Sequence, residues 1–259
     1  MLPLRDRVVV VTGASRRIAI GAAVARRAAA DGAAVVVHSW EPHDAEQPWG
    51  ADEGGAAALV DELRRGGARA EHVACDLADP SAPHQLVAAA REAFGHVDAL
   101  VANHARSSAQ RLEDLTAAEV DLSSAVNVRA SLLLAQAFAA QHEDERPGGR
   151  LLWFTSGQYS GAMPDELPYI ASKAALHQLT RSLAVHLAPR GITVNCVDPG
   201  PVDTGYADDD ARAAVAAASP SGRWGAPQDT ARLVAWLLGD EAGWVTGQTI
   251  ASDGGWSAR

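Results

Sequence analysis

A tyrosine and a lysine stand four positions apart in Tyr169-Ile-Ala-Ser-Lys173, inside a predicted helix. At this spacing both side chains lie on one helical face. Hydride transfer to or from a carbonyl carbon requires a proton to move at the carbonyl oxygen, and a phenol can move it. The ordinary phenol pKa of about 10 is too high for base action at neutral pH, but a neighbouring ammonium lowers it. The spacing indicates an acid/base pair, although an amphipathic helix with a surface lysine gives the same pattern by chance.

Two further polar residues fit the same chemistry. Ser156 ends a predicted strand shortly before Tyr169, and its hydroxyl is suited to hydrogen-bond a substrate oxygen. Asn127 lies in a long predicted helix, where its amide is suited to hold a water that links Lys173 to solvent. The four residues together predict a catalytic group of Asn127, Ser156, Tyr169 and Lys173.

A glycine turn near the N-terminus predicts a nucleotide site. The apolar run 8–11 leads into Thr12-Gly13-Ala14-Ser15-Arg16-Arg17-Ile18-Ala19-Ile20-Gly21 and then into a helix. Glycine lets a pyrophosphate approach the main chain, and a helix start offers unpaired N–H groups. An ordinary strand–helix turn has the same look, so the pattern alone is weak. The residues expected to bind cofactor here are Gly13, Ser15, Arg16, Arg17, Ile20 and Gly21.

The end of the second predicted strand bears on cofactor choice. A dinucleotide site usually reads the adenosine ribose with an acid at this point. This strand instead ends His38-Ser39-Trp40, without an acid, while Arg16 and Arg17 stand in the glycine turn. A guanidinium is able to pair with a 2′-phosphate. We therefore expect NADP(H) to be favoured over NAD(H), with Ser39 among the contacts.

Three more residues follow predicted strands. Asp76 and Leu77 come after the third strand, where the carboxylate is suited to accept from an adenine amino group, and Asn103 follows the fourth. Each alone is equally well explained as a helix cap or turn residue. Ligands of open α/β sheets bind at the carboxyl ends of the strands, so we expect all three to contact the cofactor.

Apolar runs alternate with helical stretches over residues 1–259. Strands buried on both faces imply a parallel sheet covered by helices, and their alternation with helices implies one doubly wound α/β domain with seven strands. The least regular segments are 39–52, 105–115, 141–148 and 199–221. The predicted strands are 8–11, 33–37, 70–74, 98–102, 149–155, 192–197 and 248–252, and the predicted helices are about 21–30, 56–65, 81–94, 117–141, 167–187, 211–218 and 227–238.

Composition narrows the classes of protein. The net charge of −10 argues against a nucleic-acid binder, which needs a basic face. No apolar run approaches the roughly 20 residues of a membrane helix. Residues 1–7 include an acid and lack the apolar stretch of a signal peptide. Cys75 and Cys196 form no ligand pair or disulfide framework, and the nine histidines form no recognisable cluster. We expect a cytoplasmic protein without a metal.

These motifs together resemble the short-chain dehydrogenase/reductase superfamily, in its Tyr-x-x-x-Lys branch, and are similar to β-ketoacyl-carrier-protein reductase-like members. The resemblance covers nearly the whole chain and includes Asn195-Cys-Val-Asp-Pro199-Gly200 and Asp253-Gly254-Gly255. It implies a Rossmann fold and the tetrad above, with Tyr169 as acid/base, Ser156 orienting the substrate, and Lys173 binding the nicotinamide ribose and lowering the tyrosine pKa. It also implies a tetramer or dimer. Along the nicotinamide it places Pro199, Gly200, Val202 and Thr204.

Two departures from the family pattern stand out. The glycine turn usually reads Thr-Gly-x-x-x-Gly-x-Gly, but Ala19 stands at the middle glycine and the turn is longer by two residues. We therefore expect an altered pyrophosphate path. The usual Asn-Asn-Ala-Gly reads Ala102-Asn103-His104-Ala105, and His104 either crowds the cofactor or points away.

Two segments remain open. The long loop from Glu41 begins beside the adenosine pocket, so Trp40 or Trp49 covers the adenine, or the loop is a subunit contact or a solvated insertion. The segment from Tyr206 resembles a lid over substrate. Arg212 and Arg223 are too few to establish a docking patch for an acidic acyl carrier.

The function favoured by the sequence is hydride transfer between nicotinamide and a carbonyl or secondary alcohol, on a small or carrier-bound substrate. A nucleotide-binding regulator or scaffold on the same fold is the alternative, but it has no need of Ser156, Tyr169 and Lys173 together. An enoyl reductase is a third possibility, although those relatives use a wider Tyr–Lys spacing.

Overall fold

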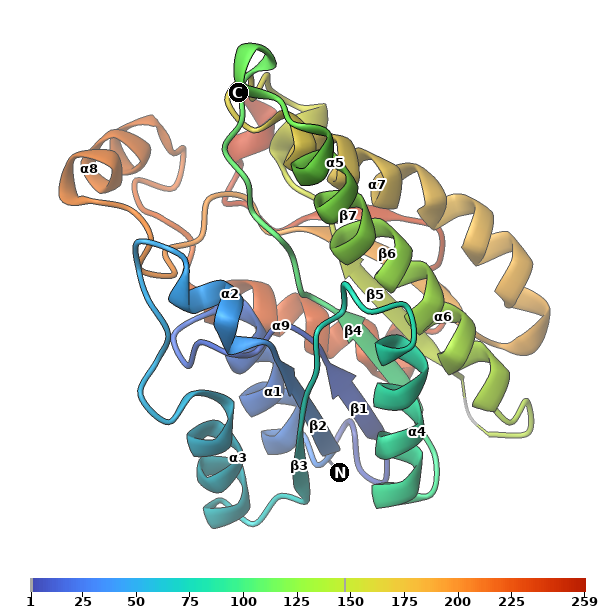
Figure 1. Cartoon of the computed structure of the whole chain (residues 1–259). Helices are drawn as coiled ribbons and strands as arrows, with labels where there is room; N and C mark the ends of the chain where they lie inside the picture. Colours follow the sequence, from blue (N-terminus) through green and yellow to red (C-terminus); the bar gives the residue numbers. More distant parts are fainter. Residues whose placement is uncertain (1, 147) are drawn as a thin grey trace.

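Seven parallel strands form one sheet in the order β3-β2-β1-β4-β5-β6-β7 in the computed structural model (Figure 1). The structure describes residues 2–146 and 148–259. Met1 of the N-terminal segment and Pro147 of the irregular segment 141–148 therefore lie outside the described residues. The strand order is that of a doubly wound fold, with the switch in direction beside β1. The strands are β1 Val8–Val11, β2 Ala34–Ser39, β3 Ala70–Ala74, β4 Ala99–Ala102, β5 Arg150–Phe154, β6 Thr193–Asp198 and β7 Thr249–Ala251.

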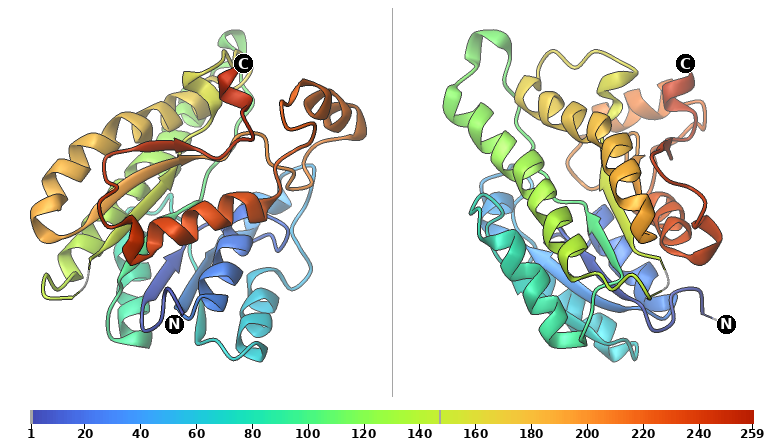
Figure 2. Two further views of the ribbon diagram at one scale, coloured as in Figure 1. Left: turned by 180° about the vertical axis from the view of Figure 1, so that it is seen from behind. Right: turned by 90° about the vertical axis from the view of Figure 1, so that its right-hand side faces the viewer.

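Helices cover both faces of the sheet (Figure 2). One face packs against α1 (Ile20–Ala30), α3 (Gly55–Arg65) and α9 (Pro227–Leu238). The other packs against α4 (Ala82–Phe94), α6 (Ala130–Gln141) and α7 (Leu167–Leu187). The continuous apolar strands of the sequence fit this arrangement because successive side chains point to opposite faces.

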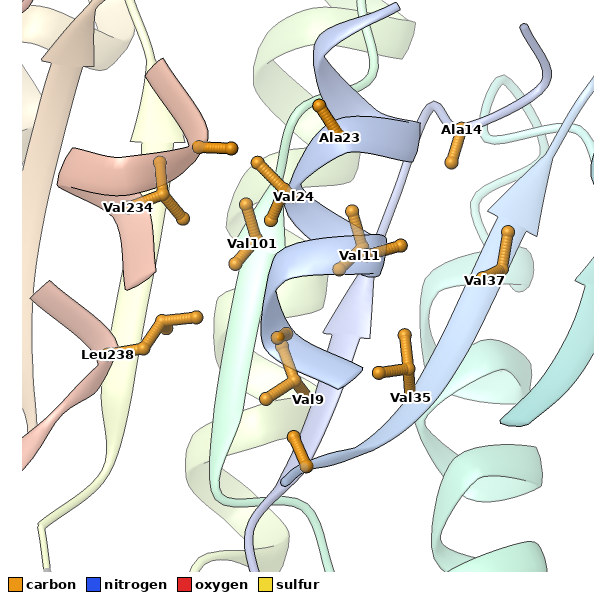
Figure 3. Close-up of a cluster of buried hydrophobic side chains, with 14 of the residues drawn as sticks. Val9, Val11, Ala14, Ala23, Val24, Val35, Val37, Val101, Val234 and Leu238 are labelled. Atoms are coloured by element: carbon orange, nitrogen blue, oxygen red, sulfur yellow. The ribbon is translucent and has the colours of Figure 1, made fainter. Parts of the chain in front are cut away.

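Branched aliphatic side chains build the core on the α1 face. Val9 and Val11 of β1 lie beside Val35 and Val37 of β2, under Val24 of α1 (Figure 3). All five are at most 1% exposed. Burying one such side chain contributes about 1.5–3 kcal/mol. This packing holds β1 and α1, and so the glycine turn between them, in a fixed position.

The structure corrects two expectations about helices. A short helix, α2 (Glu41–Ala45), forms in the segment expected to be a loop, with Pro42 in its first turn. The long helix expected over 117–141 is α5 (Ala117–Ser123), a π-helical turn over Ser124–Arg129, and α6. The π turn carries Asn127, which is fully buried. Single π turns inside α-helices are frequent at functional sites.

The remaining helix, α8 (Asp209–Ala218), follows β6 and extends away from the sheet (Figures 1 and 2). The Asp208 carboxylate caps it by accepting from the Ala211 N–H at 2.8 Å. Within residues 2–146 and 148–259, no helix has both the length and the apolar character that a membrane crossing requires.

Candidate active site

The glycine turn between β1 and α1 requires both of its glycines. Gly13 has φ +68°, and a Cβ there would lie 2.5 Å from the Cα of His104. A Cβ on Gly21 would lie 2.5 Å from the Gly13 carbonyl oxygen. The Asn103 amide donates to the carbonyls of Thr12 and Gly13 at 3.1 and 2.9 Å. Asn103 therefore braces the turn from the tip of β4.

Hydrogen bonds with Asp52, Arg26 and the Arg16 main chain fix the lengthened part of the turn, between Arg16 and Ile20. The Arg17 N–H donates to Asp52 at 2.6 Å, and the Arg26 guanidinium donates to the Arg17 carbonyl at 2.6 Å. Ala19, which replaces the middle glycine, is the N-cap of α1 and donates its N–H to the Arg16 carbonyl at 3.1 Å. Ile20 begins the helix.

A cavity of about 470 Å³ lies at the carboxyl ends of β1 to β4. This volume is within the ordinary range of ligand pockets. Five of the predicted cofactor residues line it: Gly13, Ser15, Arg16, Asp76 and Leu77. The Nε atom of Arg16 is buried and has no hydrogen-bond partner among the described residues. A close main chain and an unsatisfied guanidinium fit a phosphate-bearing nucleotide.

Trp40 and Trp49 also line this cavity. The Arg16 guanidinium lies over the Trp49 ring, 5.4 Å from its centre. Residues between Trp40 and Trp49 therefore form part of the cavity wall, and the expectation that one of the two tryptophans covers the adenine stays a prediction.

The other predicted cofactor residues lie outside the cavity lining. The Ser39 hydroxyl hydrogen-bonds His72 Nε2 at 2.8 Å at the tip of β2. Arg17 is exposed toward Asp52, with 3.8 Å between Nε and the carboxylate. The lining also omits Ile20, Gly21, Asn103, Tyr169, Lys173, Pro199, Gly200, Val202 and Thr204.

The segment after β6 is fixed at the neighbouring strand end. Gly200 has φ +61°, and a Cβ there would lie 2.4 Å from the Asp253 Cβ. The Gly200 N–H donates to the Asp198 carboxylate at 3.0 Å. Val202 is buried and forms a parallel bridge with Gly225, while Thr204 is half-buried.

Tyr169, Lys173 and Ser156 meet between α7 and the tip of β5. The Lys173 Nζ lies 5.6 Å from the centre of the Tyr169 ring and donates to the Phe154 carbonyl at 3.1 Å. The Ser156 side chain lies near enough to the Tyr169 phenol to lower the pKa of that phenol. The structure thus brings three of the four predicted catalytic residues to one point.

Asn127 is joined to this group through the main chain of α7. Its amide donates to Ser172 Oγ at 2.8 Å, and that hydroxyl donates to the Tyr169 carbonyl at 2.6 Å. The Asn127 amide also exchanges hydrogen bonds with the main chain of Arg106, at 2.7 and 3.0 Å. Asn127 therefore links the π turn, α7 and the segment after β4.

Burial, rather than the charge of Lys173, has the largest effect on the pKa of Tyr169. It raises the pKa of Tyr169 to about 12, and the nearby Ser156 side chain opposes that rise. Burial also lowers the pKa of Lys173 to about 8. The sequence led us to expect that Lys173 lowers the tyrosine pKa, whereas desolvation is the larger effect on both groups here.

The chain is similar to known oxidoreductases along nearly its whole length. A family model described as Enoyl-(Acyl carrier protein) reductase matches residues 13–257. The chain is 37% identical to the uncharacterized oxidoreductase YjdA of Bacillus subtilis, over 97% of each chain. It is 36% identical to an L-rhamnose 1-dehydrogenase (NAD(P)(+)) of Azotobacter vinelandii, also over 97% of each.

A solved structure agrees in fold and length. A short chain dehydrogenase from Burkholderia cenocepacia in complex with NADP superposes with a TM-score of 0.87 at 36% identity, covering 99% of this chain and 100% of that one. The chain belongs to the short-chain dehydrogenase/reductase superfamily. It is an oxidoreductase of that family with a Rossmann fold; the Azotobacter relative is named for NAD(P)(+), and the Burkholderia structure holds NADP.

His104, which departs from the short-chain dehydrogenase/reductase pattern, points into the protein. Its Nε2 donates to the Val126 carbonyl at 3.0 Å, and its Nδ1 accepts from the Thr12 hydroxyl at 2.7 Å. The ring is 7% exposed, and burial lowers its pKa to about 3. Of the two alternatives left open, the one in which His104 points away from the cofactor fits these contacts.

The segment predicted as a lid contacts the nucleotide end of this enzyme. The Tyr206 ring lies edge-on to Trp49, with 6.5 Å between ring centres, and edge-on to Trp224 at 5.8 Å. The Trp224 indole donates to the Arg212 carbonyl at 2.9 Å. This aromatic cluster joins the segment after β2 to the segment that carries α8.

The sequence prediction missed several residues of the cavity, including four titratable ones. His43, Asp44 and Glu46 reach the cavity from α2 and its end, and Arg106 reaches it from the segment after β4. The signal that was available is Glu41-Pro42, since proline and an acid both favour the first turn of a helix. Among the described residues, no group of three or more His, Cys, Asp or Glu side chains is arranged to hold a metal ion.

Proposed function

We propose that this protein is a carbonyl reductase or secondary alcohol dehydrogenase that prefers NADP(H) to NAD(H). The observation that carries the proposal is the meeting of Tyr169, Ser156 and Lys173 at the strand edge that also holds the nucleotide cavity. A bound reduced nicotinamide supplies the hydride. The chain supplies the proton and the orientation of the carbonyl.

Each catalytic side chain has a proposed task. Tyr169 gives its proton to the carbonyl oxygen, and its raised pKa keeps the phenol protonated for reduction. Ser156 donates a hydrogen bond to the same oxygen. The buried Lys173 ammonium binds the cofactor ribose and favours the phenolate after transfer. Asn127 holds the π turn against α7 through Ser172 and so positions Tyr169 and Lys173.

The cofactor side of the proposal rests on the glycine turn. Gly13 and Gly21 allow close approach of the pyrophosphate, and Arg16 offers a buried guanidinium to a 2′-phosphate. NADP in the Burkholderia structure supports this preference. We assign Asp76 and Leu77 to the adenosine end of the same cofactor and residues 199–204 to its nicotinamide end, whereas Arg17, which faces Asp52, is given no cofactor contact.

A small ketone or alcohol is favoured over a carrier-bound substrate. Arg212 and Arg223 are the basic residues of the lid, and both already pair with acids, Asp203 at 3.2 Å and Asp229 at 2.7 Å. Little positive charge is left there for an acidic carrier. The four-residue Tyr169–Lys173 spacing likewise favours carbonyl over enoyl reduction.

The whole chain acts as one domain that carries both sites, in a cytoplasmic homo-oligomer. The cysteines lie unpaired, as a reducing compartment would keep them. Val185 on α7 is 78% exposed and Trp244 is 98% exposed. Exposed apolar side chains of this size suit subunit contacts.

A substrate panel tests the proposal. Ketones, aldehydes and carrier-bound β-ketoacyl substrates are offered with NADPH, and secondary alcohols with NADP⁺, and absorbance of NADPH is followed. We expect turnover with at least one small carbonyl compound. Turnover of enoyl substrates alone, or of none while the protein binds NADPH, would contradict it.

A further inference from the structure

The nucleotide cavity contains opposite charges that are not paired with one another. Arg106 is satisfied by Glu119 through two hydrogen bonds of 2.7 and 2.8 Å. Asp76 accepts from the Ala78 N–H at 2.8 Å, as a turn residue does. The charged groups that remain in the cavity are Arg16 from the glycine turn and two acids from the segment after β2.

Asp44 is the acid that shares its surroundings with Arg16. The Trp49 indole N–H points at the Asp44 carboxylate over 3.5 Å, and the same Trp49 ring lies under the Arg16 guanidinium. Ser15, from the glycine turn, lies near enough to Asp44 to lower the pKa of its carboxyl, although burial has the larger, opposite effect. Asp44 is half-buried, whereas Glu46 is exposed. Within the described residues, no ion pair of 4 Å or less joins Arg16 to Asp44, and the buried Arg16 Nε has no hydrogen-bond partner, so the guanidinium retains capacity for a ligand.

We propose that Asp44 is a second determinant of cofactor choice, acting against Arg16. Its carboxylate accepts a hydroxyl of the adenosine ribose in NAD(H) and repels the 2′-phosphate of NADP(H). The enzyme therefore uses both dinucleotides, and Asp44 reduces its preference for NADP(H). This inference rests on the proposed nicotinamide-dependent function.

The chemistry follows from the donor and acceptor types. An ionised carboxylate only accepts hydrogen bonds, which suits a ribose hydroxyl and excludes a phosphate dianion. A guanidinium only donates, which suits the phosphate. The tip of β2 lacks an acid, and α2 delivers one from five residues further along the chain. The absence of an acid at the position of Ser39 is therefore not sufficient to predict which cofactor is preferred.

Calorimetric titration of the purified full chain with NADPH and with NADH tests this assignment without turnover. Asp44→Asn keeps the shape of the side chain and removes its charge. We expect it to raise the ratio of the NADH Kd to the NADPH Kd by about tenfold or more, through tighter NADPH and weaker NADH binding. Glu53→Gln is the matched control: it removes one acid from the same segment outside the cavity and should leave the ratio within about threefold of wild type.

The outcomes separate the two claims. A ratio within threefold of wild type for Asp44→Asn overturns the role of Asp44, as does an equal or larger change in Glu46→Gln. If the wild-type protein binds neither dinucleotide, the proposed function fails and this inference fails with it. If both bind but no carbonyl substrate is reduced, only the proposed reaction fails, and the ratio still decides the role of Asp44. Circular dichroism confirms that each variant is folded.

Discussion

Two buried histidines under the nucleotide cavity should make this protein labile to acid. His38 accepts from the Gly13 N–H at 3.3 Å and donates to the Cys75 carbonyl at 3.0 Å, while His104 bridges Thr12 and Val126. Burial lowers the pKa of His38 from 6.5 to about 4 and that of His104 from 6.5 to about 3. Both rings are therefore neutral in the folded protein at pH 5.

The size of the effect follows from proton uptake. The unfolded chain binds a proton at each histidine below pH 6.5, but the folded protein does not until the pH approaches 4 and 3. The stabilisation is therefore complete above pH 6.5 and is lost as the pH falls. Each group costs about 1.4 kcal/mol per pH unit, or about 2 kcal/mol at pH 5. The two together remove up to about 4 kcal/mol from a typical stability of about 5–15 kcal/mol.

Urea unfolding at pH 7.5, 6.0 and 5.0, at one protein concentration, measures this dependence. His104→Asn removes one titrating ring, so its free energy of unfolding should fall less steeply between pH 6 and 5, by about 1.4 kcal/mol per pH unit. The same replacement at His84, which is exposed on α4, is the control and should retain the wild-type slope. An unchanged slope in His104→Asn would refute the account of a buried neutral ring.

Two substitutions in the glycine turn give further expected outcomes. Arg16→Gln should raise the KM for NADPH by about tenfold or more while the KM for NADH stays within threefold, since only the 2′-phosphate loses its charged partner. Arg17→Gln, the neighbouring control that faces Asp52, should change neither; equal effects of the two would contradict the separation of their roles. Gly13→Ala should lower the Tm more than Gly67→Ala, because both glycines have positive φ but only Gly13 also meets the backbone of His104. Thermal unfolding followed by circular dichroism compares them, and an equal loss would contradict the close contact.

Much of the fold was readable because its strands are continuous apolar runs. The strands β1 and β4 to β6 are buried on both faces, and their observed ends differ from the predicted ends by one residue at most. The helix α7 matched its predicted limits because its apolar positions and the flanking Pro168 and Pro189 mark both ends. Local sequence was sufficient wherever burial was uniform.

The site was harder to predict from the sequence, because contacts between distant segments determine where its side chains point and how deeply they are buried. Arg16 and Arg17 are alike in sequence, yet one faces the cavity and the other faces Asp52. The helix α2 has five residues, too short to be stable in isolation, so its own sequence is a weak guide to its formation. The tyrosine pKa was expected to fall because Lys173 is near, but desolvation depends on packing that spacing does not report.

The most direct test of the central claim is single-turnover reduction by Tyr169→Phe, using NADPH and the best carbonyl substrate of the panel. The account predicts that the rate falls by about 10²- to 10⁴-fold, with the Kd for NADPH within threefold of wild type. Tyr159→Phe, at a half-exposed tyrosine stacked on His177, is the matched control and should retain the wild-type rate. Turnover by Tyr169→Phe at a rate comparable to wild type would contradict the assignment of Tyr169 as the proton donor.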